Sequence, residues 1–420
     1  MEPSLIFNII VVLVIFEFLS ERVLEYLNRT RWSDELPEEV KGIYDPGEYR
    51  RSQEYLKVNS KFSFFTDTYS LALLLLMLFL GGFAWLDSFI RQYTENQVLM
   101  ALLFFGALGF ASDILSLPFS IYRTFVIEEK FGFNKTTVKT FITDKLKGWL
   151  LGLIIGGGIL ALIVWIYQST GSLFWIIAWG AVTVFSIFMT LFYSDLIVPL
   201  FNKQRPLEEG ELRDAIKDFA DKVDFRLSNI FVIDGSKRST KANAYFTGLG
   251  RKKRIVLYDT LIDDHEKDEV VAVLAHEIGH YKKKHTTIGL FLSIAQTGFL
   301  FFLLSLFIGS PELSRALGAG EPSFHMGLLA FVILYSPVSW ILGLAGNILS
   351  RKHEFAADTF AGEHYRPDPL KNALKKLSVK NLSNLRPHPA YVFVYYSHPP
   401  LLQRLANLDN VDKKNTVQQQ

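Results

Sequence analysis

Long apolar runs recur along the chain and alternate with polar stretches. About seven of them come close to the roughly 20 residues that an α-helix needs to cross the hydrocarbon core of a bilayer. The first run is the shortest, contains Glu17, and continues as an amphipathic helix. The sequence therefore predicts a mainly α-helical, polytopic membrane protein. The runs cover residues 5–19, 64–90, 98–122, 149–167, 173–201, 288–308 and 326–349.

Basic residues alternate between the loops and so indicate an orientation. No lysine or arginine precedes the first run, whereas the loop after it is rich in both. The next loop has only Arg91, and the loop after the third run is basic again. Short basic loops stay on the cytoplasmic side of a membrane. We therefore expect the N-terminus outside, and both the long polar segment 202–285 and the tail after Ser350 in the cytoplasm.

The composition agrees with a membrane location. Half of the 420 residues are hydrophobic, and the mean hydropathy is positive. The net charge of +2 gives no indication of a nucleic-acid partner. The N-terminus lacks a basic segment and a small-residue cleavage site, so we interpret it as a retained span and not as a signal peptide. The absence of cysteine excludes disulfides and thiolate ligands, so any metal must be held by His, Asp or Glu.

Two polar regions could together form one compact domain outside the membrane. Residues 208–223 have helical periodicity, and residues 229–233 and 254–258 are typical of short strands. The tail is mostly helical in pattern, and the helix that ends the first polar region is expected to run into the sixth span. The predicted organisation is five spans in 1–201, a first polar region with a small β element in 202–285, two spans in 286–349 and a second polar region in 350–420.

The strongest chemical signal is the stretch HEIGH at residues 276–280, which reads H-E-x-x-H. On a helix, residues four apart share a face, so His276 and His280 can present two imidazole nitrogens to one metal ion. Glu277 projects near that metal, which suits a base acting on metal-activated water. The flank before it is apolar, so the helix is expected to be buried, where such residues are costly unless something satisfies them. A surface helix that carries them by chance is the alternative, and it would need a more polar flank.

A zinc protease needs a third protein ligand and leaves the fourth position to water. Glu354, in the segment SRKHEFAADTFA, is the candidate. Asp358, one turn later, could accept a hydrogen bond from a ligand imidazole. The alternative is that both lie on a solvated helix face, but their neighbours are small and apolar and the segment directly follows a span. His353 is expected to point elsewhere and to be structural or exposed.

Other polar residues have weaker patterns. His398, in YYSHPPLLQRL, could with Arg404 stabilise the oxyanion of a tetrahedral intermediate. A turn that caps a helix is the alternative. Asn243, in KANAYF, could bond to the main chain of a substrate held against a strand edge, or it could belong to an ordinary turn. The remaining histidines have no pattern around them and are interpreted as ordinary surface or core residues: His265, His285, His325, His364 and His388.

Several acidic residues fall within the apolar runs or at their ends. Charges at membrane depth are costly and usually face a polar interior, so these acids suggest that the spans enclose water. Glu17 and Asp195 could instead lie at the level of the lipid headgroups. The acids are Glu17, Asp67, Asp113 and Asp195.

With these residues in place, the chain resembles the integral-membrane CAAX prenyl endopeptidases, which are zinc metalloproteases of the a-factor-converting and lamin-processing type. The resemblance covers nearly the whole chain. Besides HEIGH, it depends on YDPGEYRRSQEYLKVNSKF, EEKFGFNKTT, IVPLFNKQRPLEEGEL, SKRSTKANAYFTGLGRKKRIVLYDTLI, SRKHEFAADTFA and YSHPPLLQRL.

The resemblance implies seven long helices around a large water-filled chamber, with one zinc ion (Zn2+) at its cytoplasmic end. The implied reaction is hydrolysis of a peptide bond near the C-terminus of a substrate, typically to remove the three residues after a prenylated cysteine. The implied site has His276, His280 and Glu354 as metal ligands, Glu277 as base, His398 and Arg404 beside the scissile carbonyl, and Asn243 and Tyr245 along the substrate groove.

We expect a monomer in the lipid bilayer that acts on a peptide or protein substrate. The tail VDKKNTVQQQ has no obvious retrieval signal, which favours a bacterial inner membrane over the endoplasmic reticulum of a eukaryote. Few bacterial proteins carry a CAAX prenyl group, so a membrane quality-control metalloprotease with no prenyl requirement is the alternative function. A transporter or channel would fit the spans but would not explain HEIGH, Glu354 and Asp358 together.

Overall fold

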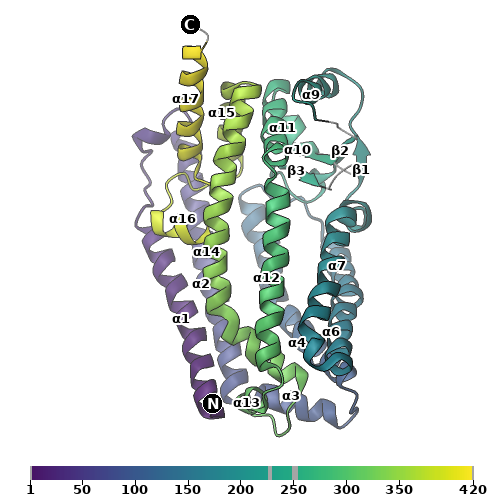
Figure 1. Ribbon diagram of the computed structural model, residues 1–420. Coiled ribbons are helices and arrows are strands. Elements are labelled where there is room, and N and C mark those ends of the chain that lie inside the picture. The colour runs from purple at the N-terminus through teal and green to yellow at the C-terminus, as the bar shows by residue number, and fades with distance from the viewer. Residues whose placement is uncertain (1, 226–228, 248–253, 419–420) are drawn as a thin grey trace.

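A computed structural model describes residues 2–225, 229–247 and 254–418 of the chain. Long helices run along an elongated molecule, and all the strands gather at one of its ends (Figure 1). We call this the sheet end; it contains β1 (Gln204–Pro206), β2 (Asn229–Ile233), β3 (Ala244–Thr247), β4 (Arg254–Tyr258), α9 (Glu211–Lys222), α10 (Asp259–Asp264), α11 (Lys267–Lys282), α15 (Pro367–Lys380) and α17 (Leu401–Gln418). The distal end, with the N-terminus, holds the short helices α3 (Gly82–Arg91) and α13 (Pro311–Ala316).

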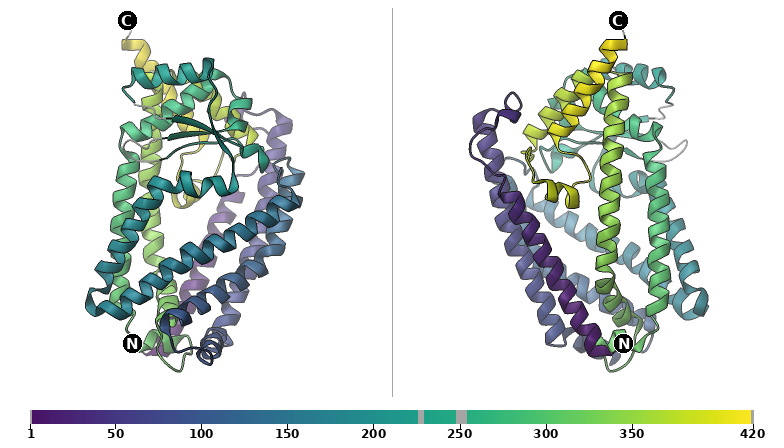
Figure 2. Two further views of the ribbon diagram at one scale, coloured as in Figure 1. Left: turned by 90° about the vertical axis from the view of Figure 1, so that its right-hand side faces the viewer. Right: turned by 60° about the vertical axis from the view of Figure 1, so that its left-hand side comes forward.

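Six helical segments in the described part of the chain are long and apolar enough to cross a membrane. One of them, Val138–Phe201, turns back at η4 (Gly171–Leu173) near the distal end (Figure 2), so it accounts for two crossings and the total is the predicted seven. The fold is mainly α-helical, as the sequence predicted. The segments are α1 (Pro3–Arg29), α2 (Pro46–Phe79), α4 (Gln97–Tyr122) with the π-helical η2 (Arg123–Glu128), α5 (Val138–Leu151) through η3 (Gly152–Gly156) into α6 (Gly157–Thr170), α7 (Phe174–Leu196) with α8 (Val198–Phe201), α12 (His285–Phe307) and α14 (Phe324–His364).

Three boundaries differ from those predicted. The run 64–90 is broken at Gly81, whose φ of 67° ends α2 and lets α3 turn across the distal end. The HEIGH helix, α11 (Lys267–Lys282), does not run into the sixth span, because Lys284 adopts a left-handed φ of 60° before α12. In contrast, α14 continues without a break through residues 349 and 350, so one helix carries both the seventh span and the second polar region's first segment.

A four-stranded sheet lies at the sheet end in the order β1-β2-β4-β3. The parallel pair β2 (Asn229–Ile233) and β4 (Arg254–Tyr258) are the two predicted strands. The antiparallel strands β1 (Gln204–Pro206) and β3 (Ala244–Thr247) are too short to give a period in the sequence. The helices around the sheet are α9 (Glu211–Lys222), α10 (Asp259–Asp264), α11 and α15 (Pro367–Lys380), followed by α16 (Pro389–Tyr395) and α17 (Leu401–Gln418).

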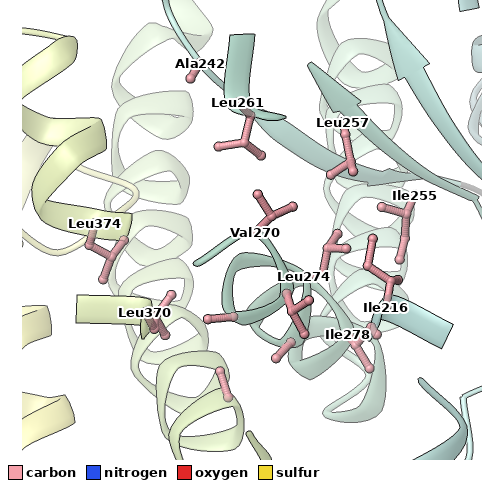
Figure 3. Close-up of a cluster of buried hydrophobic side chains, with 14 of the residues drawn as sticks. Ile216, Ala242, Ile255, Leu257, Leu261, Val270, Leu274, Ile278, Leu370 and Leu374 are labelled. Atoms are coloured by element: carbon pink, nitrogen blue, oxygen red, sulfur yellow. The ribbon is translucent and has the colours of Figure 1, made fainter. Parts of the chain in front are cut away.

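The core of the sheet end forms between β4 and α11. Ile255 and Leu257 alternate along β4 and point toward Leu274 and Ile278 of α11 (Figure 3), and all four side chains are fully buried. Burial of each such side chain stabilises the fold by about 1.5–3 kcal/mol. The apolar flank of HEIGH is therefore buried as predicted, and it fixes α11 against the sheet.

The spans are packed together at their ends but not in their middles. Among the described residues of α4, none is buried between Phe104 and Ile127, and in α14 none is buried between Phe331 and Glu354. A helix inside a filled bundle would bury a continuous apolar stripe. The middles of the spans therefore face open space on more than one side, which agrees with a fold whose helices enclose a chamber.

Most of the acids in the spans have a basic partner. Asp67 lies 2.6 Å from Arg22, and Asp113 lies 2.7 Å from Lys145. Asp195 pairs with Arg254. These partners offset much of the cost of placing a carboxylate at membrane depth, so the acids are weaker support for water between the spans than the sequence suggested.

Candidate active site

Helix α11 brings the two histidines of HEIGH to one face. It begins with a capping box between Glu266 and Glu269, which satisfies free backbone N–H groups at the helix start. The Nε2 atoms of His276 and His280 lie 3.1 Å apart. Two imidazole nitrogens therefore converge on one point, as the four-residue spacing predicted.

The glycine of HEIGH allows α14 to approach closely. A Cβ atom on Gly279 would lie 3.2 Å from the backbone of Ala357 and 3.1 Å from the ring of Phe360. Small residues on both helices let the two backbones come near enough for Glu354, one turn before Ala357, to reach the histidines. The residues between the ligands thus have a packing role that H-E-x-x-H alone does not reveal.

Glu354 completes a group that can hold a metal ion. Its Oε1 lies 3.2 Å from His280 Nε2, and its Oε2 lies 3.5 Å from His276 Nε2. One ligand atom from each of the three residues lies within 4.8 Å of the others. Glu354 Oε2 is buried and has no hydrogen-bond partner. Two imidazoles and a carboxylate are a donor set that zinc accepts, and a cation between them would satisfy this oxygen.

Asp358 lies behind His276. The Nδ1 atom of His276 is 2.8 Å from Asp358 Oδ1, so this nitrogen can donate a hydrogen bond to the carboxylate while Nε2 faces the ligand group. Arg404 forms a bidentate pair with the same carboxylate, at 2.6 and 2.8 Å. Asp358 is fully buried, and its charge is balanced by these two partners.

His398 and Arg404 both reach the carboxylate of Glu354. His398 Nε2 lies 3.3 Å from Glu354 Oε1, and Arg404 Nη1 lies 3.6 Å from Glu354 Oε2. Arg404 lies on α17 and His398 lies just before this helix, so the C-terminal tail brings both of them to the three converging side chains.

Glu277 is half-buried and lines the same cavity as the ligands. Burial raises the pKa of its carboxyl group, although the neighbouring His276 and His280 oppose this shift. A raised pKa brings a carboxylate closer to the value that suits proton transfer at neutral pH. Burial also disfavours a charged imidazole, but the carboxylates of Asp358 and Glu354 outweigh this effect and raise the pKa of His276 to about 9.

A cavity of about 580 Å³ connects these groups to the sheet. It is lined by residues of α11, α12, α14 and the tail, and also by the edge strand β3. Of the predicted substrate residues, Asn243 lines the cavity and Tyr245 does not. The side chain of Tyr245 packs against Val256 and Tyr258, on the face of the sheet that turns away from α11.

Among the described residues, no strand pairs with the outer edge of β3, which we call its free edge. Tyr258 N donates to Asn243 O, and the register then pairs the polar groups of residues 243, 245 and 247 with β4. The backbone groups of Ala244 and Phe246 consequently point away from β4. At present the Ala244 N–H is hydrogen-bonded to Oδ1 of Asn243, 2.9 Å away.

The segment before β3 contacts three membrane-spanning helical segments and the loop between two of them. Lys241 Nζ lies 3.1 Å from both the Tyr55 hydroxyl of α2 and Glu128 Oε2, and 4.2 Å from the ring centre of Phe133. Arg238 forms a bidentate pair with Asp144 of α5 at 2.7 and 2.9 Å. Residues of three motifs that are distant in the sequence therefore meet here: Tyr55 of YDPGEYRRSQEYLKVNSKF, Glu128 and Phe133 of EEKFGFNKTT, and Lys241 of SKRSTKANAYF. These contacts fix where the edge strand begins.

Two histidines near the ligands were not expected there. His285, interpreted as ordinary, has its Nδ1 atom 3.0 Å from Nδ1 of His280. His353, expected to point elsewhere, stacks on His285 with ring centres 3.9 Å apart. Both line the cavity. The remaining histidines have structural contacts: His265 and His364 bond to backbone carbonyls, His388 caps α16, and His325 pairs with Asp87.

Comparison with protein-family models gives two matches that follow one another along the chain. Residues 25–203 match the family described as CAAX prenyl protease N-terminal, five membrane helices. Residues 206–412 match peptidase family M48. The second match contains HEIGH, Glu354, Asp358, His398 and Arg404.

Curated relatives and a solved structure agree with these matches. CAAX prenyl protease 1 homolog of Arabidopsis thaliana is 38% identical over 90% of this chain and 91% of its own length. CAAX prenyl protease 1 of Saccharomyces cerevisiae is 37% identical over 95% and 94%, and the Homo sapiens homolog is 33% identical over 89% and 88%. The crystal structure of S. mikatae Ste24p matches with a TM-score of 0.90 and 36% identity, over 97% of this chain and 99% of that one.

Family, fold and site are thus consistent with one another. The multi-pass fold resembles that of a solved relative over nearly its full length, and the M48 match covers the residues that converge at the sheet end. The chain is a membrane zinc metallopeptidase that belongs to peptidase family M48 and, within it, to the CAAX prenyl proteases.

Proposed function

We propose that this protein hydrolyses a peptide bond near the C-terminus of a prenylated substrate, with one zinc ion held by His276, His280 and Glu354. The observation that carries the proposal is the convergence of these three side chains, with the buried Oε2 of Glu354 lacking a hydrogen-bond partner, in a cavity that β3 borders. A zinc ion in this site would polarise the scissile carbonyl and activate water as a nucleophile.

Glu277 is the general base in this proposal. It takes the proton of the attacking water and returns it to the nitrogen of the departing amine. Its place on the cavity wall beside both histidines, and the raised pKa of its carboxyl group, support this role. Asp358 orients His276 by accepting a hydrogen bond from its Nδ1–H, which leaves Nε2 free to bind the metal.

His398 and Arg404 stabilise the negative charge that develops on the carbonyl oxygen. Both lie beside Glu354, and Arg404 is held in place by its bidentate contact with Asp358. A donor that is fixed before the reaction needs little reorganisation when charge develops. We propose that His398 is not a metal ligand. Its Nε2 lies 3.3 Å from Glu354 Oε1, so a count of the imidazoles bound to zinc would test this assignment.

The edge strand β3 holds the substrate main chain. An extended peptide would pair with the outward-facing backbone groups of Ala244 and Phe246, and Asn243 would release the Ala244 N–H that it now occupies. Asn243 is therefore a substrate-binding residue in this proposal. Tyr245, predicted for the same role, contributes only through the position of its main chain on the strand.

The names of the relatives support a prenylated CAAX substrate, and the open space between the middles of the spans could receive an apolar chain. The relatives named above are eukaryotic, which favours the membrane of the endoplasmic reticulum over the bacterial inner membrane that the tail suggested. We propose the orientation that the basic loops predict, with the sheet end in the cytoplasm, and a monomer as the working unit.

The test uses purified full-length protein and two matched C-terminal peptides, one farnesylated on its cysteine and one not. The proposal predicts that zinc-loaded protein removes the last three residues of the farnesylated peptide, and that Glu277→Gln does not. Mass spectrometry identifies the products. Equal cleavage of both peptides would instead support the quality-control function, and a lack of cleavage of either would overturn the proposal.

A further inference from the structure

The two histidines of HEIGH have different partners behind them. His276 has Asp358 at its Nδ1 atom, and Asp358 is itself held by Arg404. His280 has no carboxylate on that side among the described residues. Its Nε2 faces Glu354 at 3.2 Å, and its Nδ1 lies 3.0 Å from Nδ1 of His285. A histidine that binds metal needs an acceptor for its other ring N–H, because this bond fixes the tautomer and the orientation of the ring.

The break between α11 and α12 is what brings His285 to this position. A straight helix advances about 100° per residue, so the fifth residue after His280 would point about 140° away from it. Lys284 instead adopts a left-handed φ of 60°, and His285 becomes the first residue of α12. This break between the helices places the ring of His285 against His280.

The ring of His285 is held on its other side by His353. The two rings are almost parallel, with an interplanar angle of 7° and centres 3.9 Å apart. His353 directly precedes Glu354 on α14. Helix α14 therefore supplies the proposed ligand Glu354 and, from the adjacent residue, the ring of His353 on which His285 packs.

We propose that His285 is a positioning residue for the zinc site: its Nδ1 accepts a hydrogen bond from the Nδ1–H of His280, while His353 fixes the plane of its ring by stacking. His285 then carries its own proton on Nε2. This assignment leaves His280 neutral, with Nε2 free for the metal, and it gives each histidine of HEIGH an acceptor of a different kind. The inference depends on the proposed zinc function of His276, His280 and Glu354.

The test measures zinc affinity by competition with a chromophoric chelator, on purified full-length variants, and so does not depend on catalysis. His285→Phe keeps a ring that can stack on His353 but removes the acceptor. Loss of such an outer partner typically weakens metal binding about 10–100-fold. His285→Asn places an amide oxygen near the position of the lost nitrogen, and it should restore most of the affinity. His353→Phe should bind zinc nearly as the wild type does, and His353→Ala more weakly.

His364→Phe is the matched control, because His364 bonds to a backbone carbonyl and stacks on Phe360 away from the ligands. It should bind zinc like the wild type. Wild-type affinity in folded His285→Phe would overturn the inference, as would His285→Asn that is no better than His285→Phe. If His285→Phe does not fold, the comparison of His353→Phe with His353→Ala decides in the same way. Wild-type protein that binds no zinc would overturn the proposed function together with the inference, whereas the first results would overturn the inference alone.

Discussion

Helix α14 contributes to a cluster of histidine, carboxylate and arginine side chains near each of its ends. His325 lies in its first turn at the distal end, and Glu354 lies near the sheet end. The two positions are about 44 Å apart along the helix, at the usual rise of roughly 1.5 Å per residue. The same three kinds of side chain thus occur twice in one protein, and the comparison shows which features distinguish a reactive site from a structural one.

In the distal cluster, the carboxylate is fully satisfied. Asp87 Oδ1 lies 2.6 Å from His325 Nε2, and its Oδ2 accepts from Arg91 at 2.8 Å. Arg91 also reaches Glu321 at 3.2 Å. The His325–Asp87 contact ties the start of α14 to α3, and Arg91 pairs with the charge of the buried carboxylate, which is a structural role.

In the cluster at the sheet end, the protein does not supply a hydrogen-bond partner for every polar atom. Two imidazole nitrogens and a carboxylate point at one another, and Glu354 Oε2 is left without a hydrogen bond. The cluster also opens into a cavity beside a free strand edge. Buried charge alone therefore does not indicate a reactive site. The features that indicate one are metal-binding side chains that converge, a carboxylate oxygen without a hydrogen bond, and an adjacent cavity that could hold a substrate.

Among substitutions at the two ends of α14, removal of a proposed metal ligand should have the largest effect on zinc content and activity. We expect Glu354→Ala to lose both bound zinc and peptidase activity, because two imidazoles remain where three ligands are needed. Zinc content by atomic emission and peptide cleavage are the measurements. Retention of one zinc per chain in folded Glu354→Ala would show that Glu354 is not a ligand.

Removing the base should separate chemistry from metal binding. Glu277→Gln keeps the size of the side chain but cannot accept the proton, so kcat should fall about 10²–10⁴-fold while zinc remains bound. Steady-state kinetics and zinc content are measured on the same preparation. An unchanged kcat would assign the base to another residue.

A neutral substitution behind a ligand should have a smaller effect. Asp358→Asn leaves an acceptor for His276 but removes the charge that faces Arg404, and zinc affinity should fall about 10–100-fold. Chelator competition measures this change. Unaltered affinity, with unaltered kcat, would reduce Asp358 to a packing role.

The same substitution at the distal end is the matched control and should leave catalysis unchanged. Asp87→Asn leaves an acceptor for His325 but removes the buried charge that faces Arg91, so Tm should fall. Zinc affinity and kcat at a temperature where the variant is folded should equal those of the wild type. A loss of zinc in folded Asp87→Asn would mean that the two ends of α14 are coupled.

The parts of this picture that follow from local pattern could be predicted from the sequence. The apolar runs gave the seven crossings, and the spacing of His276 and His280 gave their convergence. The proximity of Glu354 to these histidines was expected because its neighbours are small and apolar and its segment directly follows a span; its role as a ligand stays a prediction. The strands β2 and β4 were recognised because five residues suffice to give a pattern, whereas β1 and β3 are shorter.

Features that depend on backbone geometry between elements could not be predicted. The contact of His285 with His280 requires the left-handed φ of Lys284, and lysine has no preference that would announce it. The stack with His353 requires the alignment of α12 against α14. The side of the sheet to which Tyr245 turns depends on the register of β3, and a shift of one residue would reverse it.

X-ray absorption at the zinc edge of the wild-type protein tests the central claim most directly. Zinc held by His276, His280 and Glu354 should show two imidazole ligands and otherwise oxygen, at the roughly 2.0–2.2 Å distances typical of zinc. His398 is the residue that could change this result, because its Nε2 lies 3.3 Å from Glu354 Oε1. A signal from three imidazoles would contradict the account, since His398 would then be a ligand and could not be the partner of the oxyanion.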